Sequence, residues 1–427
     1  MLHQGPITTR SRQALITRQR FALFGALLFA ATLPFALREL LLPDPAYIHT
    51  SRISLFANVA AVILATWIRL SVSTFPGTRS GTIIAPAIAA AHGVIIALLL
   101  MTRLPYDRLG IALGFMFHLT WIIALHLTVH RRIRRRFAVV PCGVVDHLRR
   151  IEGVDWKMLR RPDLIETDGC DAVVADFTAD LPPEWEAFLA DAALEGRMVF
   201  QVKQLSESLT GRVEVAHLSE NSFGSLIPAR GYFHLKALID FLAALVLVPV
   251  LIVPMVAVAL AIRLDSEGPV LFRQRRVGQA GRPITVYKFR TMRSIDAVED
   301  ERAAAMTEAE DHRITRIGGF LRRSRIDELP QIINILKGEM SWIGPRPEAA
   351  VLSTWYTGEI PYYRYRHVVR PGISGWAQVN QGHVAAVDEV HAKLQYDFFY
   401  IKYFSPWLDT LILFRTIKTM LTGFGAK

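Results

Sequence analysis

The sequence predicts a membrane protein in three parts: a four-helix transmembrane bundle (1–136), a small parallel α/β domain (137–230), and a mixed α/β domain (231–427) that begins with a re-entrant membrane helix. The chain has 427 residues, 52% of them hydrophobic, which is long enough for two or three domains. Four long apolar blocks lie in its first third. Short β-branched runs then alternate with a helical pattern, and a further apolar stretch with two internal prolines follows.

The four apolar blocks lie approximately at 21–37, 53–70, 82–102 and 109–129. About 20 apolar residues span the hydrocarbon core of a bilayer, so these blocks are of the right order of length for transmembrane helices. The first block begins too far from the start of the sequence, and is too closely followed by other apolar blocks, to be a cleaved signal peptide. Buried core helices of a soluble protein are the alternative, and four nearly uncharged blocks in a row argue against it.

Arginines set the expected orientation of this bundle. Arg10, Arg12, Arg18 and Arg20 precede the first block, and RRIRRR (131–136) follows the fourth. By the positive-inside rule both ends of the bundle are cytoplasmic. The net charge of +11 suits an anionic membrane surface or phosphate-bearing ligands. Nucleic acid would suit the charge equally, but four membrane spans argue against it.

The second part, 137–230, has the pattern of a small parallel α/β unit. FAVVPCGVV, CDAVVADF and RMVFQVK are strand-like, and WEAFLADAALEG has helical period. A dinucleotide site needs a glycine-rich turn after the first strand, and PCGVVD supplies only Gly143, so we expect a structural or regulatory role. Cys142 and Cys170 have neither metal-ligand spacing nor a disulfide framework, which favours a cytoplasmic location.

The stretch 241–262 carries no charge and could span a bilayer, but two observations favour a helix that enters the membrane and returns. Pro249 and Pro254 each remove a helix hydrogen bond and bend the axis. A fifth crossing would also place the rest of the chain outside the cell. That part of the sequence looks like a cytosolic enzyme. We therefore predict a re-entrant helix at about 238–262, with a true span as the alternative.

A run of basic residues without any acid follows at 268–295, and it can bind anions. Its members are Arg273, Arg275, Arg276, Arg282, Lys288, Arg290 and Arg293. Guanidinium groups bind phosphate bidentately, and the glycines in RRVGQAGRP let backbone N–H groups approach an anion. A basic face resting on anionic lipid headgroups is equally compatible with this composition.

The adjacent acids Asp327 and Glu328 follow a second basic cluster. Its members are His312, Arg313, Arg316, Arg322, Arg323 and Arg325. The pattern places Asp327 near a helix N-terminus with Pro330 in the first turn, so helix capping alone would explain an isolated pair. Among arginines, however, a carboxylate stays ionised and can act as a nucleophile while its neighbour holds a divalent cation. Arg346, between two prolines in WIGPRPEA, supports a phosphate site.

Three longer stretches resemble the bacterial polyprenyl-phosphate sugar-1-phosphate transferases, which are phosphoglycosyl transferases built around a single re-entrant membrane helix. They are KFRTM (288–292), DHRITRIGGFLRRSRIDELPQIINILKGEMSWIGPRPE (311–348) and RPGISGWAQVNQG (370–382). The resemblance covers about 235–427. It implies that the preceding residues are the four transmembrane helices and degenerate Rossmann-like domain of the larger members, and that the last part is a mixed α/β interfacial catalytic domain.

The resemblance also implies a reaction. Such enzymes move a hexose 1-phosphate from a UDP-sugar to undecaprenyl phosphate, giving undecaprenyl-diphosphate-sugar and UMP, as the first step of exopolysaccharide or O-antigen synthesis. Glucose and galactose are the favoured sugars, and N-acetylated sugars stay open. The family often breaks its re-entrant helix at Ser-Pro, where this chain has Val253 and Pro254.

Site residues follow from the same resemblance, position by position. Asp327 matches the nucleophile that forms a covalent phosphosugar-aspartate, and Glu328 matches its dyad partner at the Mg²⁺ ion. Basic positions suited to the diphosphate or the lipid phosphate are matched by Lys288, Arg290, Arg313 and Arg346. Gln378 and Asp397 fall in later motifs and are expected at the nucleotide end.

The expected partners are a UDP-sugar, undecaprenyl phosphate and the lipid bilayer, with a homodimer left open and no nucleic acid. The expected location is the bacterial inner (cytoplasmic) membrane, with the catalytic domain facing the cytoplasm. A non-catalytic membrane scaffold of a polysaccharide assembly complex is the main alternative, but it gives no reason for Asp327, Glu328 and Arg346 to occur together. A CDP-alcohol phosphotransferase would need an aspartate-rich motif along a membrane helix, which the sequence lacks.

Overall fold

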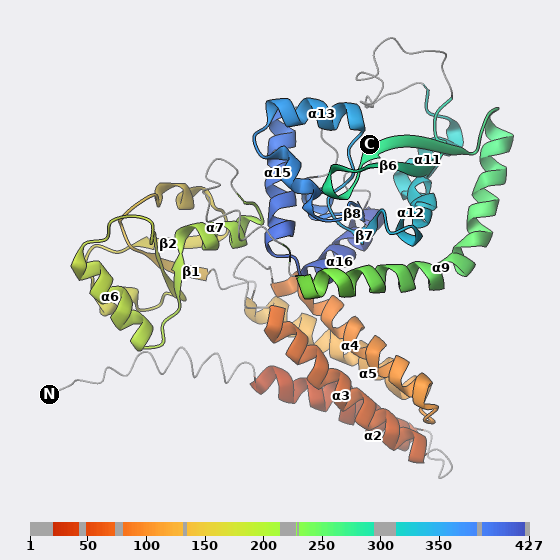
Figure 1. Ribbon diagram of the computed structural model, residues 1–427. Helices are drawn as coiled ribbons and strands as arrows, with labels where there is room; N and C mark the ends of the chain where they lie inside the picture. Colours follow the sequence, from red (N-terminus) through yellow and green to blue (C-terminus); the bar gives the residue numbers. More distant parts are fainter. Residues whose placement is uncertain are drawn as a thin grey trace. The chain divides into compact units, whose positions relative to one another are not determined.

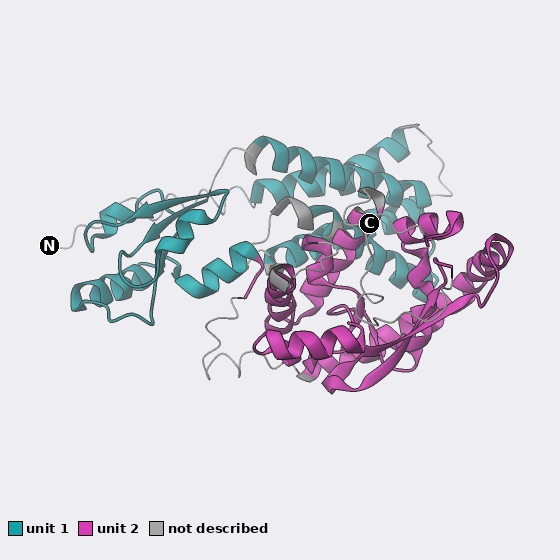
Figure 2. Cartoon of the chain, turned by 90° about the horizontal axis from the view of Figure 1, so that it is seen from above, with its two compact units in different colours: residues 1–210 teal, residues 211–427 magenta. Residues whose placement is uncertain are grey.

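The computed structural model describes residues 20–41, 48–72, 80–130, 135–213, 228, 230–293, 313–381 and 387–422. They belong to two compact units, Met1–Thr210 and Gly211–Lys427 (Figure 2). Arg10, Arg12, Arg18 and residues 131–134, on which the predicted orientation depends, lie outside the described residues. Most of the segment that leads to the predicted boundary at residue 230 also lies outside them.

Long apolar helices form the first part of unit 1 (Figure 1). They are Arg20–Leu40, which contains the π-helical turn η1 (Leu28–Thr32) and runs into α2 (Leu33–Leu41), then α3 (Ile48–Val72), α4 (Ser80–Thr102), and α5 (Arg108–Leu125) with η3 (His126–His130). Arg20–Leu40, Ile48–Leu70 and Arg108–Thr128 are long and apolar enough to cross a membrane, and Ala87–Thr102 is a shorter apolar helix. The predicted apolar blocks are therefore all helical.

A four-stranded parallel sheet forms the second part of unit 1, in the order β2-β1-β3-β4. The strands are β1 (Arg135–Val139), β2 (Val154–Met158), β3 (Ala172–Ala175) and β4 (Val199–Gln201), accompanied by η4 (Asp146–Arg150) and η5 (Leu164–Thr167). Helix α6 (Pro183–Leu194) packs through Trp185 and Phe188 on one face, and α7 (Val202–Thr210) packs through Leu205 on the other. The predicted small parallel α/β unit is confirmed, whereas strand β2 was not expected.

The first helix that the structure describes in unit 2 is α9 (Arg230–Asp265), the longest of the described helices, which contains both Pro249 and Pro254. Figure 1 shows that α9 is bent, with β6, α11 and α12 on its concave side. Ala244 packs there against β6 and α12, and Ile262 packs against Leu321 of α11. Many apolar side chains of α9 are exposed, and the stretch Gly231–Asp265 is long and apolar enough to cross a membrane.

The rest of unit 2 is mixed α/β, as expected. A hairpin of β5 (Leu271–Val277), η6 (Gln279–Gly281) and β6 (Pro283–Phe289) is followed by α11 (Arg316–Ser324), η7 (Ile326–Gln331) and α12 (Ile332–Leu336). Strand β7 (Ser341–Ile343) pairs in parallel with β8 (Gly372–Ser374). The remaining helices are α13 (Ala350–Glu359), η8 (Tyr363–Val368), α14 (Trp376–Asn380), α15 (Val387–Lys402) and α16 (Pro406–Thr422). Aromatic side chains of α14 and α15 fill the main core.

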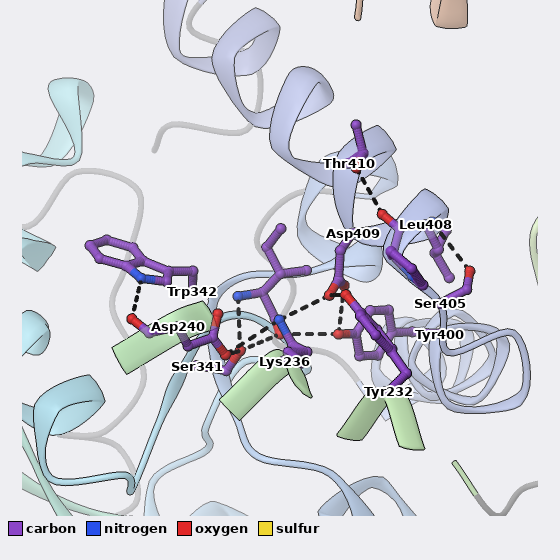
Figure 3. Close-up of polar contacts among 12 residues, drawn as sticks. Tyr232, Lys236, Asp240, Ser341, Trp342, Tyr400, Ser405, Leu408, Asp409 and Thr410 are labelled. Atoms are coloured by element: carbon purple, nitrogen blue, oxygen red, sulfur yellow. Dashed lines mark hydrogen bonds and ion pairs between the residues drawn. The ribbon is translucent and has the colours of Figure 1, made fainter. Parts of the chain in front are cut away.

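A buried polar cluster ties the first turns of α9 to the helices and strand of this domain (Figure 3). Lys236 Nζ lies 2.9 Å from Asp409 Oδ2 of α16 and 3.5 Å from Asp240 Oδ2. Asp240 Oδ2 accepts a hydrogen bond of 2.6 Å from Ser341 Oγ, and the Tyr400 hydroxyl donates to Asp409 at 2.8 Å. Because every charge in this cluster has a partner, it anchors the apolar helix to the domain.

Candidate active site

The two acids Asp327 and Glu328 occupy the first turn of η7. Helix α11 ends at Ser324, and Arg325 then adopts a left-handed backbone conformation with φ 57°, which turns the chain into η7. Arg325 is also the N-cap of η7, and no side chain caps that end. The alternative in which Asp327 serves only as a helix cap is therefore wrong.

Glu328 is the bound member of the pair. Its Oε1 accepts hydrogen bonds from Lys288 Nζ at 2.8 Å and from Arg346 Nη2 at 2.7 Å. Burial alone would raise the pKa of Glu328, but the charges of Arg346 and Lys288 outweigh burial and hold the pKa well below its usual range. Glu328 is therefore an anion at the centre of a buried ion-pair network.

Asp327 is the free member of the pair. Its carboxylate receives neither a hydrogen bond nor an ion pair from the residues that the structure describes, although its side chain is largely buried. Burial and the negative charge of Glu328 raise the pKa of Asp327, and the more distant charges of Lys288, Arg346 and Arg322 only partly oppose this. The arginines do lower the pKa of Asp327, but burial and Glu328 outweigh them, because the nearest cations bind Glu328. The expectation that Asp327 is ionised at neutral pH stays a prediction.

The basic groups of the site come from strands and loops that the fold brings to η7. Lys288 lies near the end of β6, Arg276 lies on the neighbouring strand β5, and Arg346 lies in the loop after β7. Burial lowers the pKa of Lys288 to about 8, against the raising effect of Glu328. Burial and Arg346 lower the pKa of Arg276 to about 10. Arg276 donates to the backbone carbonyl of Pro347 and so holds the loop that carries Arg346.

A second buried network positions Arg346. Arg366 of η8 donates through Nη2 to the Arg346 carbonyl at 2.9 Å and pairs with Asp397 Oδ2 at 2.8 Å. Lys393 of α15 pairs with Glu348, two residues after Arg346. Sequence reasoning did not single out Arg366, Glu348 or Lys393. The sequence did contain one signal for this network, which was Glu348 in GPRPE. An acid among so many bases needs a basic partner, so its presence indicated that further paired residues were to be found.

The other predicted site residues have separate positions. Arg290 donates to the carbonyl of Ser266 at 2.7 Å and to that of Glu267, so its guanidinium fastens the end of α9. Gln378 Nε2 donates to the Ile373 carbonyl at 3.0 Å, while its Oε1 is buried without a hydrogen bond. The carbonyl of Arg313 accepts a hydrogen bond of 2.9 Å from the Arg293 N–H. Direct contacts join Lys288 and Arg346 to Glu328, next to Asp327, and the substrate roles of all six basic and polar residues stay predictions.

The donor set of the dyad fits a hard divalent cation. Glu328 Oε2 is buried without a hydrogen bond, and Arg325 Nη1 lies 3.9 Å from it. The described residues contain no group of three or more His, Cys, Asp or Glu that could hold a metal ion by themselves. Mg²⁺ commonly binds one or two carboxylates together with water and substrate phosphates, so these two carboxylates suit a cation shared with a substrate.

An exposed apolar helix beside buried paired acids and bases defines a membrane-associated enzyme for an anionic substrate. Residues 231–423 match the family model described as bacterial sugar transferase. A UDP-N-acetylgalactosamine-undecaprenyl-phosphate N-acetylgalactosaminephosphotransferase of Aeromonas hydrophila is 44% identical over 357 residues, which are 83% of this chain and 83% of that protein. The chain therefore belongs to the bacterial sugar transferase family, and the resemblance inferred from its motifs is confirmed.

Other relatives match less than half of the chain. A UDP-glucose:undecaprenyl-phosphate glucose-1-phosphate transferase of Xanthomonas campestris pv. campestris is 45% identical over 190 residues, 44% of this chain and 38% of that protein. An enzyme of the same description from Escherichia coli (strain K12) is 43% identical over 162 residues, 38% of this chain and 34% of that protein. The non-catalytic scaffold that was the main alternative is thus not supported, since these relatives are transferases.

Proposed function

We propose that this chain transfers a hexose 1-phosphate from a UDP-sugar to undecaprenyl phosphate, as the first step of exopolysaccharide or O-antigen synthesis. The observation that carries the proposal is the difference between the two carboxylates: Glu328 is held by Lys288 and Arg346, whereas Asp327 beside it has no partner among the described residues. One acid is thus fixed as an anion, and the other is available to react. The names of the relatives support the same substrates.

The chemical steps follow from a free carboxylate beside bound cations. An Asp327 oxygen attacks the sugar-bearing phosphorus of the UDP-sugar, the bond from that phosphorus to the bridging oxygen breaks, and UMP leaves with the electron pair. A phosphate oxygen of undecaprenyl phosphate then attacks the same phosphorus and releases Asp327 as a carboxylate. The raised pKa of Asp327 makes it a stronger nucleophile in its ionised form, while the nearby guanidinium groups stabilise charge on the phosphoryl oxygens.

A Mg²⁺ ion fits this mechanism, with Glu328 Oε2 as the protein ligand we propose. When bound, the ion would neutralise charge on the phosphate oxygens of the substrate. Lys288 and Arg346 both donate to Oε1 of Glu328 and so fix the orientation of its carboxylate. Oε2 therefore keeps one position, where it could bind the ion. Arg366, through the Arg346 carbonyl, keeps that loop in position.

We propose a re-entrant topology for α9, in the bacterial inner membrane and with unit 2 on the cytoplasmic side. The acceptor lipid lies in the membrane and the sugar nucleotide in the cytosol, so the site has to lie at the interface. The bend of α9, its two internal prolines and its exposed apolar side chains support a helix that enters and leaves on one side (Figure 1).

The donor sugar is the least constrained part of the proposal. Glucose and galactose were favoured from the sequence, whereas the relative that aligns with both units carries an N-acetylgalactosamine name. Purified full-length chain should therefore be assayed with undecaprenyl phosphate and a panel of UDP-glucose, UDP-galactose and UDP-N-acetylgalactosamine, scored for UMP release. Release with none of these sugar nucleotides would contradict the proposed reaction.

The mechanism is tested without acceptor lipid. Enzyme mixed with the preferred UDP-sugar should release about one UMP per active site and keep the phosphosugar on Asp327, because covalent catalysis separates the two half-reactions. Asp327→Asn should lose both the burst and the label. Parental turnover in that variant, or UMP that appears only after acceptor lipid is added, would disprove the covalent intermediate.

A further inference from the structure

Arg370 opens the motif RPGISGWAQVNQG and has no role in the function proposed above. In the described part of the chain its guanidinium donates no hydrogen bond and pairs with no acid, and its Nε is buried. Its Cζ lies 5.9 Å from the centroid of the Phe233 ring of α9. Arg370 as a whole is half-buried, but its Nε–H has lost water without gaining an acceptor, which is unfavourable. This side chain therefore suits an anion that reaches the hollow.

Arg370 lines a hollow beside the first turns of α9. The walls of this hollow are mostly apolar, from Phe233, Ala237, Ile343, Val369 and Phe404. Lys236 and Asp240 also line it, but Lys236 pairs with Asp240 and Asp409, and Asp240 accepts a hydrogen bond from Ser341. Among the described lining residues Arg370 is therefore the cation left without a counter-ion.

The surroundings of the hollow indicate the kind of anion. Next to Phe233 and Ala237, the α9 side chains Leu235 and Leu238 are 53% and 55% exposed, which suits contact with acyl or prenyl chains. Arginine binds phosphate bidentately, and a guanidinium at the edge of an apolar wall suits a phosphate with a hydrocarbon chain attached. A soluble phosphate would gain nothing from the apolar wall.

We propose that Arg370 binds the phosphate group of a membrane lipid, with the first part of the lipid chain lying against Phe233, Ala237 and Phe404. This site is separate from the dyad, whose basic partners Lys288 and Arg346 are bound to Glu328. Both a glycerophospholipid and a polyprenyl phosphate carry the required group. The lipid would fill the place of the missing counter-ion and hold the start of α9 at the depth of the headgroups.

The test measures thermal unfolding of the delipidated full-length chain in detergent, with four additives: phosphatidylglycerol, undecaprenyl phosphate, diacylglycerol without phosphate, and inorganic phosphate. A ligand that binds only the folded state raises the unfolding midpoint. Arg370→Gln is compared with Arg364→Gln, an exposed arginine on η8 of the same unit. Arg370→Lys keeps the charge and serves as the second variant if Arg370→Gln does not fold.

We expect one or both lipid phosphates to raise the midpoint of the parent and of Arg364→Gln, with apparent affinity about tenfold weaker in Arg370→Gln or Arg370→Lys. Stabilisation by undecaprenyl phosphate alone would identify the acceptor as the source, and stabilisation by phosphatidylglycerol would identify a bilayer phospholipid. Equal stabilisation by inorganic phosphate or by diacylglycerol, or an unchanged response in the Arg370 variants, would overturn the proposal. UMP release from the UDP-sugar without lipid is measured separately. The lipid-site proposal can therefore fail while the proposed transferase reaction stands, and the reverse.

Discussion

Lys288 makes the site sensitive to pH at the scale of one side chain. Burial lowers its pKa to about 8, so it loses its proton as the pH rises through that value, and Glu328 is then held by Arg346 alone. Because this loss of charge removes one cation from the site, we expect the rate of UMP release to fall as the pH rises through about 8. Lys288→Arg should move this fall to higher pH, because a guanidinium stays protonated. The same alkaline limb in both proteins would exclude Lys288 as its cause.

Glu328 provides the second prediction at this scale. Glu328→Gln keeps the shape but removes the charge that Lys288 and Arg346 bind, so two buried cations lose their partner. We expect the rate of UMP release to fall by about 100-fold or more, and the Mg²⁺ concentration for half-maximal rate to rise. Glu359→Gln, at an exposed position on α13, is the control. Full activity with the parental Mg²⁺ response would remove Glu328 from the metal site.

Helix α11 offers a matched pair of glycines at the scale of one element. A Cβ at Gly318 would lie 2.1 Å from the Thr291 carbonyl oxygen, whereas a Cβ at Gly319 would meet only Ile314 Cγ2, at 3.9 Å. Gly318→Ala should therefore lower the free energy of unfolding by about 1–3 kcal/mol, since backbone must move. Gly319→Ala should raise it by about 0.5–1 kcal/mol through helix propensity.

Denaturant unfolding of both variants measures the difference, and UMP release measures its consequence. Because α11 leads directly into Arg325 and the dyad, displacement of this helix should also slow the reaction in Gly318→Ala and leave Gly319→Ala near the parental rate. Equal stability in the two alanine variants would show that the close approach of α11 to Thr291 is not needed.

Topology is the prediction for the whole molecule. If α9 enters and leaves the membrane on one side, tags at residue 200 and residue 427 should both be accessible only from the cytoplasm. Labelling of intact cells and of inverted vesicles with an impermeant reagent measures this. A tag at 427 that is reached from outside, while the tag at 200 is not, would mean that α9 spans the bilayer and that the active site has been placed on the wrong side.

Much of the fold could be predicted because hydrophobic patterning decides it. The apolar helices, the bent α9 and the strands β1, β3 and β4 all coincide with apolar or β-branched runs. Strand β2 could not be found in this way. It is a short edge strand with a largely half-buried pattern, and its sequence VDWKM carries charges at its second and fourth positions instead of forming an apolar run.

The site was predicted less completely, because ion pairs between residues far apart in the sequence cannot be recognised from local sequence patterns. The sequence indicated Asp327, Glu328, Lys288 and Arg346 but not which carboxylate the cations would bind. That choice depends on how β6, η7 and the loop after β7 meet in space. Arg366, Lys393 and Glu348 were missed for the same reason, since each is a single charge in an ordinary helix or loop until the fold brings them together.

Helix α9 is fastened at both ends, at one by Lys236 and Asp240 to α16 and β7, and at the other by Arg290 to the carbonyls after its last turn. A transmembrane helix usually answers a change in bilayer thickness by tilting, and a helix fixed in this way has lost that freedom. The lipid must then adapt to the protein. We expect α9 to keep one depth in the membrane whatever the bilayer thickness. Turnover of the transferase should therefore pass through an optimum as the acyl chains of the host vesicle are lengthened.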